Sequence, residues 1–139
     1  MGRIVVGYDG SDCSKAALRQ AVGLAKGFDD GVVLVFGYAP PGIWGGEIAE
    51  HEEAIEEFGA TVIDEAKRLV ETSGVEAEYE LVAKRAAEAM IDIAEAQDAR
   101  MIVVGGGGET PLKGAILGST PYKLLHQTDR PVLVVSASG

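Results

Sequence analysis

Met101-Ile102-Val103-Val104-Gly105-Gly106-Gly107-Gly108 passes from an apolar run directly into four glycines. Continuous apolar residues of this kind are typical of a strand buried on both faces of a parallel sheet. Glycine has no Cβ, so a ligand can approach the backbone closely and several N–H groups can face an anion. The spacing continues as Gly105, two residues, Gly108, nine residues and then Gly118-Ser119. We interpret it as a phosphate-binding segment; the alternative is a flexible loop.

The residues around the glycines support a phosphate site of an uncommon kind. Ser119 and Thr120 supply hydroxyls near the start of the next expected helix. A Walker A loop is excluded, because Lys113 is followed by Gly114 and not by Ser or Thr. The dinucleotide fingerprint is excluded as well, because Thr110 stands where its third glycine belongs. Lys113 is either a phosphate contact or a solvated loop lysine.

Composition limits the classes of partner. The 139 residues suit one globular domain over 1–139, and the formal charge of −10 disfavours nucleic acid and anionic membranes. A small anionic ligand remains compatible, since oriented backbone N–H groups need no net positive charge. No apolar run approaches the ~20 residues of a membrane span. Cys13 is the only cysteine, so an intrachain disulfide is impossible and a cytoplasmic location is expected.

Five strand-like runs alternate with four helical patterns. Strands are expected over Arg3–Tyr8, Gly31–Tyr38, Glu76–Val82, Arg100–Val104 and Pro131–Ser136. Helices are expected from a cap at Ser11 or Ser14 to about Lys26, then over Glu50–Thr72, Ala86–Gln97 and from Ser119 or Thr120 to about His126. With right-handed crossovers this order predicts an α/β fold, a doubly wound parallel sheet. Glu76–Val82 alternates apolar and polar residues, which indicates an edge strand.

In doubly wound folds, ligands bind at the carboxyl ends of the strands where the strand order reverses. The segments that leave those ends here are Asp9-Gly10, Gly37-Tyr38 and Gly105–Gly108. If the first and fourth strands are neighbours, Asp9 faces the glycine segment. Asp9 then orients a ribose or base, or alternatively only stabilises the turn and the first helix.

Three stretches together resemble the universal stress protein family. They are Val5-Val6-Gly7-Tyr8-Asp9-Gly10-Ser11, the Gly-x-x-Gly-x9-Gly-Ser spacing, and the closing Arg130-Pro131-Val132-Leu133-Val134-Val135. The resemblance covers nearly the whole chain. It implies a sheet in the order 3-2-1-4-5, helices on both faces, a bound ATP or related adenine nucleotide, and a dimer formed by pairing of the last strands.

The same resemblance implies roles for individual residues. Gly105 and Gly108 form the turn around the phosphates, and Gly118 and Ser119 hold the phosphates from the start of the last helix. Thr120 adds a second hydroxyl there. On the adenosine side, Asp9 contacts the nucleoside, the neighbouring backbone at Gly10 contacts adenine, and Val104 lines the base pocket.

The chain departs from the family pattern at three positions. Gly37 stands where a valine often packs on the base, and Pro121 stands where a hydroxyl or small residue is common near the phosphates. Glu109 follows the glycines and repels phosphate by about 1 kcal/mol if exposed near ~4 Å, which Lys113 can offset. The scaffold is therefore expected to be intact, while nucleotide affinity depends on these positions.

Two classes of function follow. The first is an ATP-binding regulatory or sensing module with weak or no hydrolysis, taking ATP, ADP or AMP, with Mg²⁺ as an optional companion. The second is a dimeric partner-binding stress protein of the same fold that binds no nucleotide. An ATP-dependent enzyme would need a base or nucleophile that the sequence does not offer, and His51 and His126 are too few for a metal site.

The last expected strand also carries an assembly prediction. The resemblance places Pro131–Ser136 at a sheet edge, and an uncovered apolar edge tends to pair with another strand. Symmetric pairing with a second copy satisfies its free backbone groups and buries the valines. A homodimer through this strand is expected.

Overall fold

The computed structural model describes residues 1–37, 48–82, 84–106 and 119–137. Nine elements follow one another along the chain: β1 Arg3–Gly7, α1 Asp12–Phe28, β2 Gly31–Gly37, α2 Ile48–Glu71, β3 Ala77–Val82, α3 Ala86–Ala96, β4 Met101–Gly105, α4 Ser119–Gln127 and β5 Val132–Val135. Every helix and strand expected from the sequence is present, with ends that differ by no more than two residues. None of these helices is long and apolar enough to cross a membrane.

All five strands form one parallel sheet in the order β3-β2-β1-β4-β5. The centre of the sheet is β1, whose Val5 pairs with Val33 of β2 on one side and with Ile102 of β4 on the other. The order predicted through the family resemblance is confirmed, as is the edge position of β3. The strand order reverses between β1 and β4, so their carboxyl ends form the switch point of this fold.

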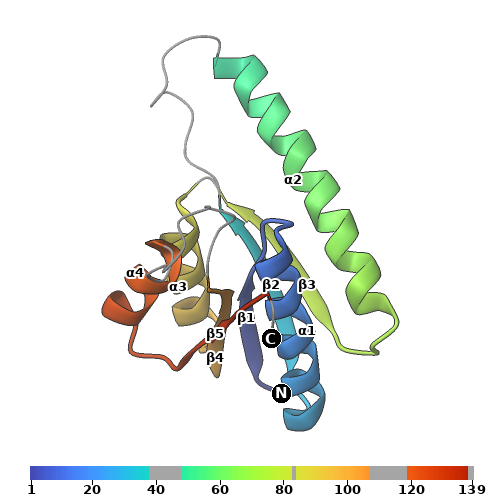
Figure 1. Cartoon of the computed structure of the whole chain (residues 1–139), viewed down its shortest axis with the longest axis vertical. Coiled ribbons are helices and arrows are strands. Elements are labelled where there is room, and N and C mark those ends of the chain that lie inside the picture. Colours follow the sequence, from blue (N-terminus) through green and yellow to red (C-terminus); the bar gives the residue numbers. More distant parts are fainter. Residues whose placement is uncertain (38–47, 83, 107–118, 138–139) are drawn as a thin grey trace.

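Helices cover both faces of the sheet (Figure 1). Because side chains alternate along a strand, Ile4 and Val6 face α1 and α2, whereas Val5 faces α3 and α4. Burial of a side chain of this size stabilises the fold by about 1.5–3 kcal/mol relative to exposure. Both apolar layers therefore stabilise the central strand. Figure 1 also shows that the first half of α2 extends beyond the end of the sheet.

The boundaries of α1 come from local hydrogen bonds. Of the two predicted caps, Ser11 is the N-cap, and its Oγ accepts from the backbone N–H of Ser14 at 3.2 Å. The helix ends at Asp29, whose φ of 59° is left-handed and whose N–H faces the carbonyls of Ala25 and Lys26. Aspartate takes a position usually given to glycine, because a short polar side chain tolerates this conformation.

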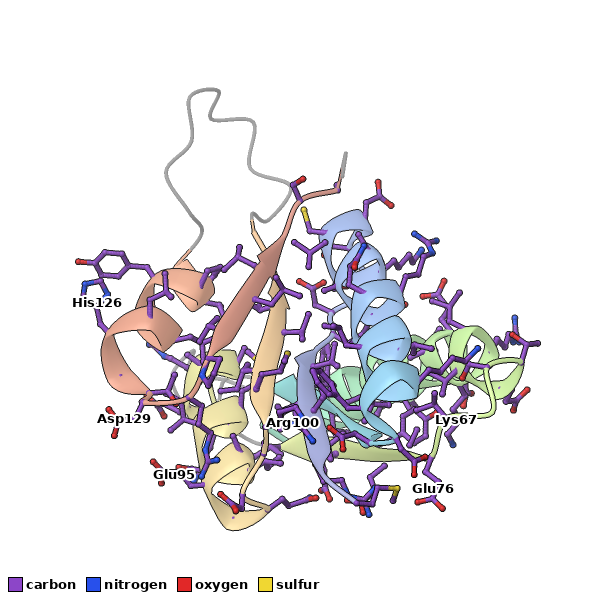
Figure 2. All side chains as sticks on the ribbon, turned by 90° about the horizontal axis from the view of Figure 1, so that it is seen from below. Lys67, Glu76, Glu95, Arg100, His126 and Asp129 are labelled. Atoms are coloured by element: carbon purple, nitrogen blue, oxygen red, sulfur yellow. The ribbon has the colours of Figure 1, made fainter. Side chains whose placement is uncertain are left out.

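An ion pair holds together the amino ends of three strands. The Asp30 side chain is only 1% exposed and accepts from Arg100 Nε at 2.6 Å. The Gly2 N–H also donates to Asp30 Oδ1, at 2.9 Å. Arg100 lies over the ring of Phe28, 4.2 Å from its centroid, and is labelled in Figure 2. The hydrogen bond from Arg100 lowers the pKa of Asp30 more than burial raises it, so the carboxylate is ionised.

Candidate functional site

The structure brings three predicted segments to one edge of the sheet. Asp9 follows β1, while Gly37 and Gly105 are the last residues of β2 and β4. Because β2, β1 and β4 are neighbours, these residues lie on three adjacent strands. The Tyr8 N–H continues the pairing of β1 with β2 by donating to the Val35 carbonyl at 3.0 Å. The condition set by the sequence, that the first and fourth strands are neighbours, is met.

Asp9 is exposed and held in a fixed orientation. Its Oδ1 accepts from the Ser11 N–H at 2.9 Å, and its own N–H faces Ser14 Oγ at 3.4 Å. Partial burial raises the pKa of Asp9, but hydrogen bonds from Ser11 and Ser14 together lower it by more. The carboxylate is therefore ionised, stabilises the turn into α1 and keeps acceptor capacity toward solvent. The turn-stabilising role is thus present, and the nucleoside role stays a prediction.

Gly10 makes the sharp turn after Asp9 possible. Its φ is +83°, in the left-handed region that other residues rarely adopt. A Cβ at Gly10 would lie 3.5 Å from Val62 Cγ2 and 3.8 Å from Glu65 Oε2, both on α2. The middle of α2 therefore lies against the turn that links β1 to α1.

Gly105 has a packing role that the sequence did not reveal. A Cβ there would lie 2.6 Å from the Cβ of Cys13 and 2.8 Å from its backbone carbon. Only glycine lets the first turn of α1 lie this close to the end of β4. Gly106 donates its N–H to the Val135 carbonyl at 2.8 Å, so that donor is already used. The amino end of α1 consequently lies beside the start of the glycine segment.

The remaining predicted residues divide into two groups. Val104 is 6% exposed and belongs to the apolar layer under α3 and α4. Ser119 is the first residue of α4, followed by a half-buried Thr120, and Pro121 lies in the first turn. Outside the described residues lie Gly108, Glu109, Lys113 and Gly118. Within the described part of the chain, no three His, Cys, Asp or Glu side chains are grouped as metal ligands.

Tyr8 is a residue of this corner that the sequence reasoning did not single out. Its side chain is buried, and its hydroxyl makes no hydrogen bond to any described residue. The alternation of β1 could have placed it, because Ile4 and Val6 precede it on the same face. The lack of a hydrogen-bond partner could not have been predicted, because it depends on which residues surround the hydroxyl in three dimensions.

Residues 1–136 match the model of the universal stress protein family. This chain belongs to that family. The universal stress protein MJ0531 of Methanocaldococcus jannaschii is 31% identical over 141 residues, which cover 96% of this chain and 81% of that protein.

Solved structures share the fold over almost the whole chain. The hypothetical protein MJ0577 has a TM-score of 0.86 at 24% identity, covering 96% of this chain and 94% of its own. A universal stress protein in complex with cAMP has a TM-score of 0.70 at 26% identity, covering 98% and 97%. The universal stress protein of Archaeoglobus fulgidus in complex with dAMP has a TM-score of 0.71 at 25% identity, covering 97% and 98%.

Proposed function

We propose that this protein binds an adenine nucleotide, with ATP as the first candidate, and acts as a regulatory or sensing module with weak or no hydrolysis. The observation that carries the proposal is the oriented carboxylate of Asp9 at the switch point between β1 and β4. The packing of Gly105 against Cys13 places the amino end of α1 beside the glycine segment. That end presents positive partial charge, which favours an anion.

The solved relatives support the class of ligand. Two of them are complexes with cAMP and dAMP, which share an adenine base and one phosphate. ATP differs from them by its longer phosphate chain, which the Gly105, Gly108, Gly118 and Ser119 spacing is expected to hold. Mg²⁺ would neutralise that chain and is an optional companion. A cytoplasmic location fits such a ligand.

Titration calorimetry with ATP, with and without Mg²⁺, tests the proposal, and AMP and ADP serve as comparisons. Saturable binding at up to millimolar ligand is expected. Gly118→Val should abolish it, because a side chain at the residue before α4 would obstruct the phosphates. Absence of both heat and thermal shift at millimolar ligand would refute the proposal.

A second candidate function is a partner-binding protein of the same fold without nucleotide. It is favoured by the structural reasons now found for two of the glycines, since Gly105 is needed for helix packing and the Gly106 N–H is used by Val135. The glycine segment would then have a folding role only. Under this reading, calorimetry gives no signal and the protein still assembles as a dimer.

We also propose that β5 pairs with its copy in a homodimer. The strand is at the edge of the sheet, and Leu133 is 37% exposed. Light scattering should give twice the 14.5 kDa mass of the chain. Val134→Lys should return the mass to that of one chain, because the charge opposes burial at the new interface. A single-chain mass for the unmodified protein at tens of micromolar would contradict the proposal.

A further inference from the structure

The Tyr8 hydroxyl is an unusual polar group in this core. The residue is 4% exposed, and Oη is the one buried side-chain nitrogen or oxygen that finds no partner among the described residues. A buried hydroxyl without a hydrogen bond is unfavourable, and most proteins avoid it. A ligand that offers an acceptor to this hydroxyl would remove that cost.

The two carboxylates that influence this phenol already have other partners. Asp9 Oδ1 accepts from the Ser11 N–H, and Glu65 Oε1 lies 3.8 Å from Lys15 Nζ. Burial raises the pKa of the Tyr8 phenol, the charges of Glu65 and Asp9 raise it further, and Arg19 lowers it. The phenol is therefore protonated at neutral pH and keeps its proton available to donate.

Tyr8 directly follows β1 and so adjoins the corner where the adenosine part is expected. Tyr8 directly precedes Asp9 and packs in the same buried cluster as Val62 of α2. Val62 and Glu65 lie against the turn at Gly10. The Glu65 side chain is 47% exposed and held by one long ion pair, which contributes little stability. A ligand atom that displaced the Lys15–Glu65 ion pair would therefore cost little stability.

We propose that the Tyr8 hydroxyl donates a hydrogen bond to an uncharged acceptor on the nucleoside part of the bound nucleotide, a ribose oxygen or a ring nitrogen of the base. The inference rests on the proposed nucleotide binding. A phosphate is disfavoured as the acceptor because the carboxylates of Asp9 and Glu65 repel it. The glycine segment that is expected to hold the phosphates continues from β4, not from β1.

Tyr8→Phe removes the hydroxyl and keeps the ring, so it tests this donor alone. Affinity for ATP and for AMP, measured by calorimetry, should fall by a similar factor of about five to ten. The unfolding midpoint of the empty protein should stay unchanged or rise, since no hydrogen bond is lost there. Tyr79→Phe is the matched control, because Tyr79 packs on the same face of the sheet from β3 and should leave affinity unchanged.

The outcomes separate this inference from the proposed function. If the unmodified protein binds no nucleotide, the proposed function fails. If it binds and Tyr8→Phe binds equally well, only the Tyr8 inference is overturned. A loss confined to ATP would mean that the hydroxyl serves the phosphates, and a less stable empty variant would mean that it already has a partner; either result overturns the inference.

Discussion

At the amino ends of the strands a buried carboxylate is fully paired, whereas at the carboxyl ends an exposed carboxylate and a buried hydroxyl have capacity left. Asp30 accepts from Arg100 and Gly2, and so connects β1, β2 and β4. Asp9 is held by hydrogen bonds with Ser11 and with Ser14 of α1, and Tyr8 Oη makes no hydrogen bond to the described residues. The comparison indicates that one end of the sheet serves stability and the other is available for a ligand.

The pKa values of the two aspartates are lowered for different reasons. For Asp30 the main cause is the hydrogen bond from Arg100, which outweighs burial. For Asp9 burial is the largest single influence and raises the pKa, and only the sum of the hydrogen bonds from Ser11 and Ser14 outweighs it. Asp30 is thus matched by an opposite charge, while Asp9 makes no ion pair with any of the described residues.

The largest effect is expected at the amino ends. Asp30→Ala removes the acceptor shared by Arg100 and Gly2, and it should lower the free energy of unfolding by about 3 kcal/mol. Urea denaturation followed by circular dichroism measures this. Asp64→Ala, on the exposed side of α2, is the control and should stay within about 0.5 kcal/mol. If both variants lowered the free energy of unfolding by the same small amount, the amino ends of the strands would not have the stabilising role inferred above.

The same residue predicts a dependence on pH. A carboxyl whose pKa is lower in the folded state adds stability above its unfolded value of about 3.9, and that stability is lost as pH falls through the folded pKa. The stability of the unmodified protein should therefore fall below about pH 4 more steeply than that of Asp30→Ala. Parallel curves of stability against pH would show that the ion pair does not contribute.

Gly105→Ala should have the next largest effect on stability, and it tests the packing at the carboxyl ends of the strands. The added Cβ would overlap both the Cβ and the backbone of Cys13, so α1 must shift. The shift should lower the free energy of unfolding by about 2 kcal/mol. A thermal or urea denaturation series measures the loss. If stability is unchanged, the close packing of α1 on β4 is not required, and Gly105 would be retained for another reason.

Ser11→Ala should lower the free energy of unfolding by about 1 kcal/mol, because the variant loses the side-chain cap on the Ser14 N–H. Ser11→Asp keeps an acceptor at the cap and should recover most of the loss. Denaturation of both variants against the unmodified protein makes the test. A Ser11→Asp variant as unstable as Ser11→Ala would argue against the cap.

The smallest expected effect has the opposite sign. Gly23 lies within α1 with open space around its Cβ position. Gly23→Ala should therefore raise the free energy of unfolding by roughly 0.5–1 kcal/mol. It is chemically the same change as Gly105→Ala, so the pair isolates the effect of the surroundings. A loss of stability at Gly23 would show that this face of α1 is covered by a partner.

Local patterns predicted the elements well because each depends on near neighbours. The apolar run at 101–104 became β4, and Ser11 was one of two predicted caps for α1. The edge strand at 76–82 was indicated by its alternation. The order of the strands in the sheet could not be predicted from local patterns, since periodicity does not specify which strands pair. It was predicted from the family resemblance.

The candidate site was predicted in part. The sequence placed Asp9 and Gly105 at the carboxyl ends of their strands, and the strand order implied by the family resemblance made these ends neighbours. The contact between Gly105 and Cys13 could not be predicted, since it joins residues from separate elements. The roles of Gly108, Lys113 and Gly118 stay predictions.

The sequence by itself determined the alternation of strands and helices, the buried central strands and the glycine spacing, because these follow from side chains close together along the chain. Only the tertiary structure decided that Asp30 pairs with Arg100, 70 positions away, and that the buried Tyr8 hydroxyl makes no hydrogen bond to the part of the chain that is described. Burial and hydrogen bonding depend on which distant residues fold against a group. The amino ends of the strands, which serve stability, and the carboxyl ends, which are available for a ligand, could therefore be distinguished only in the assembled sheet.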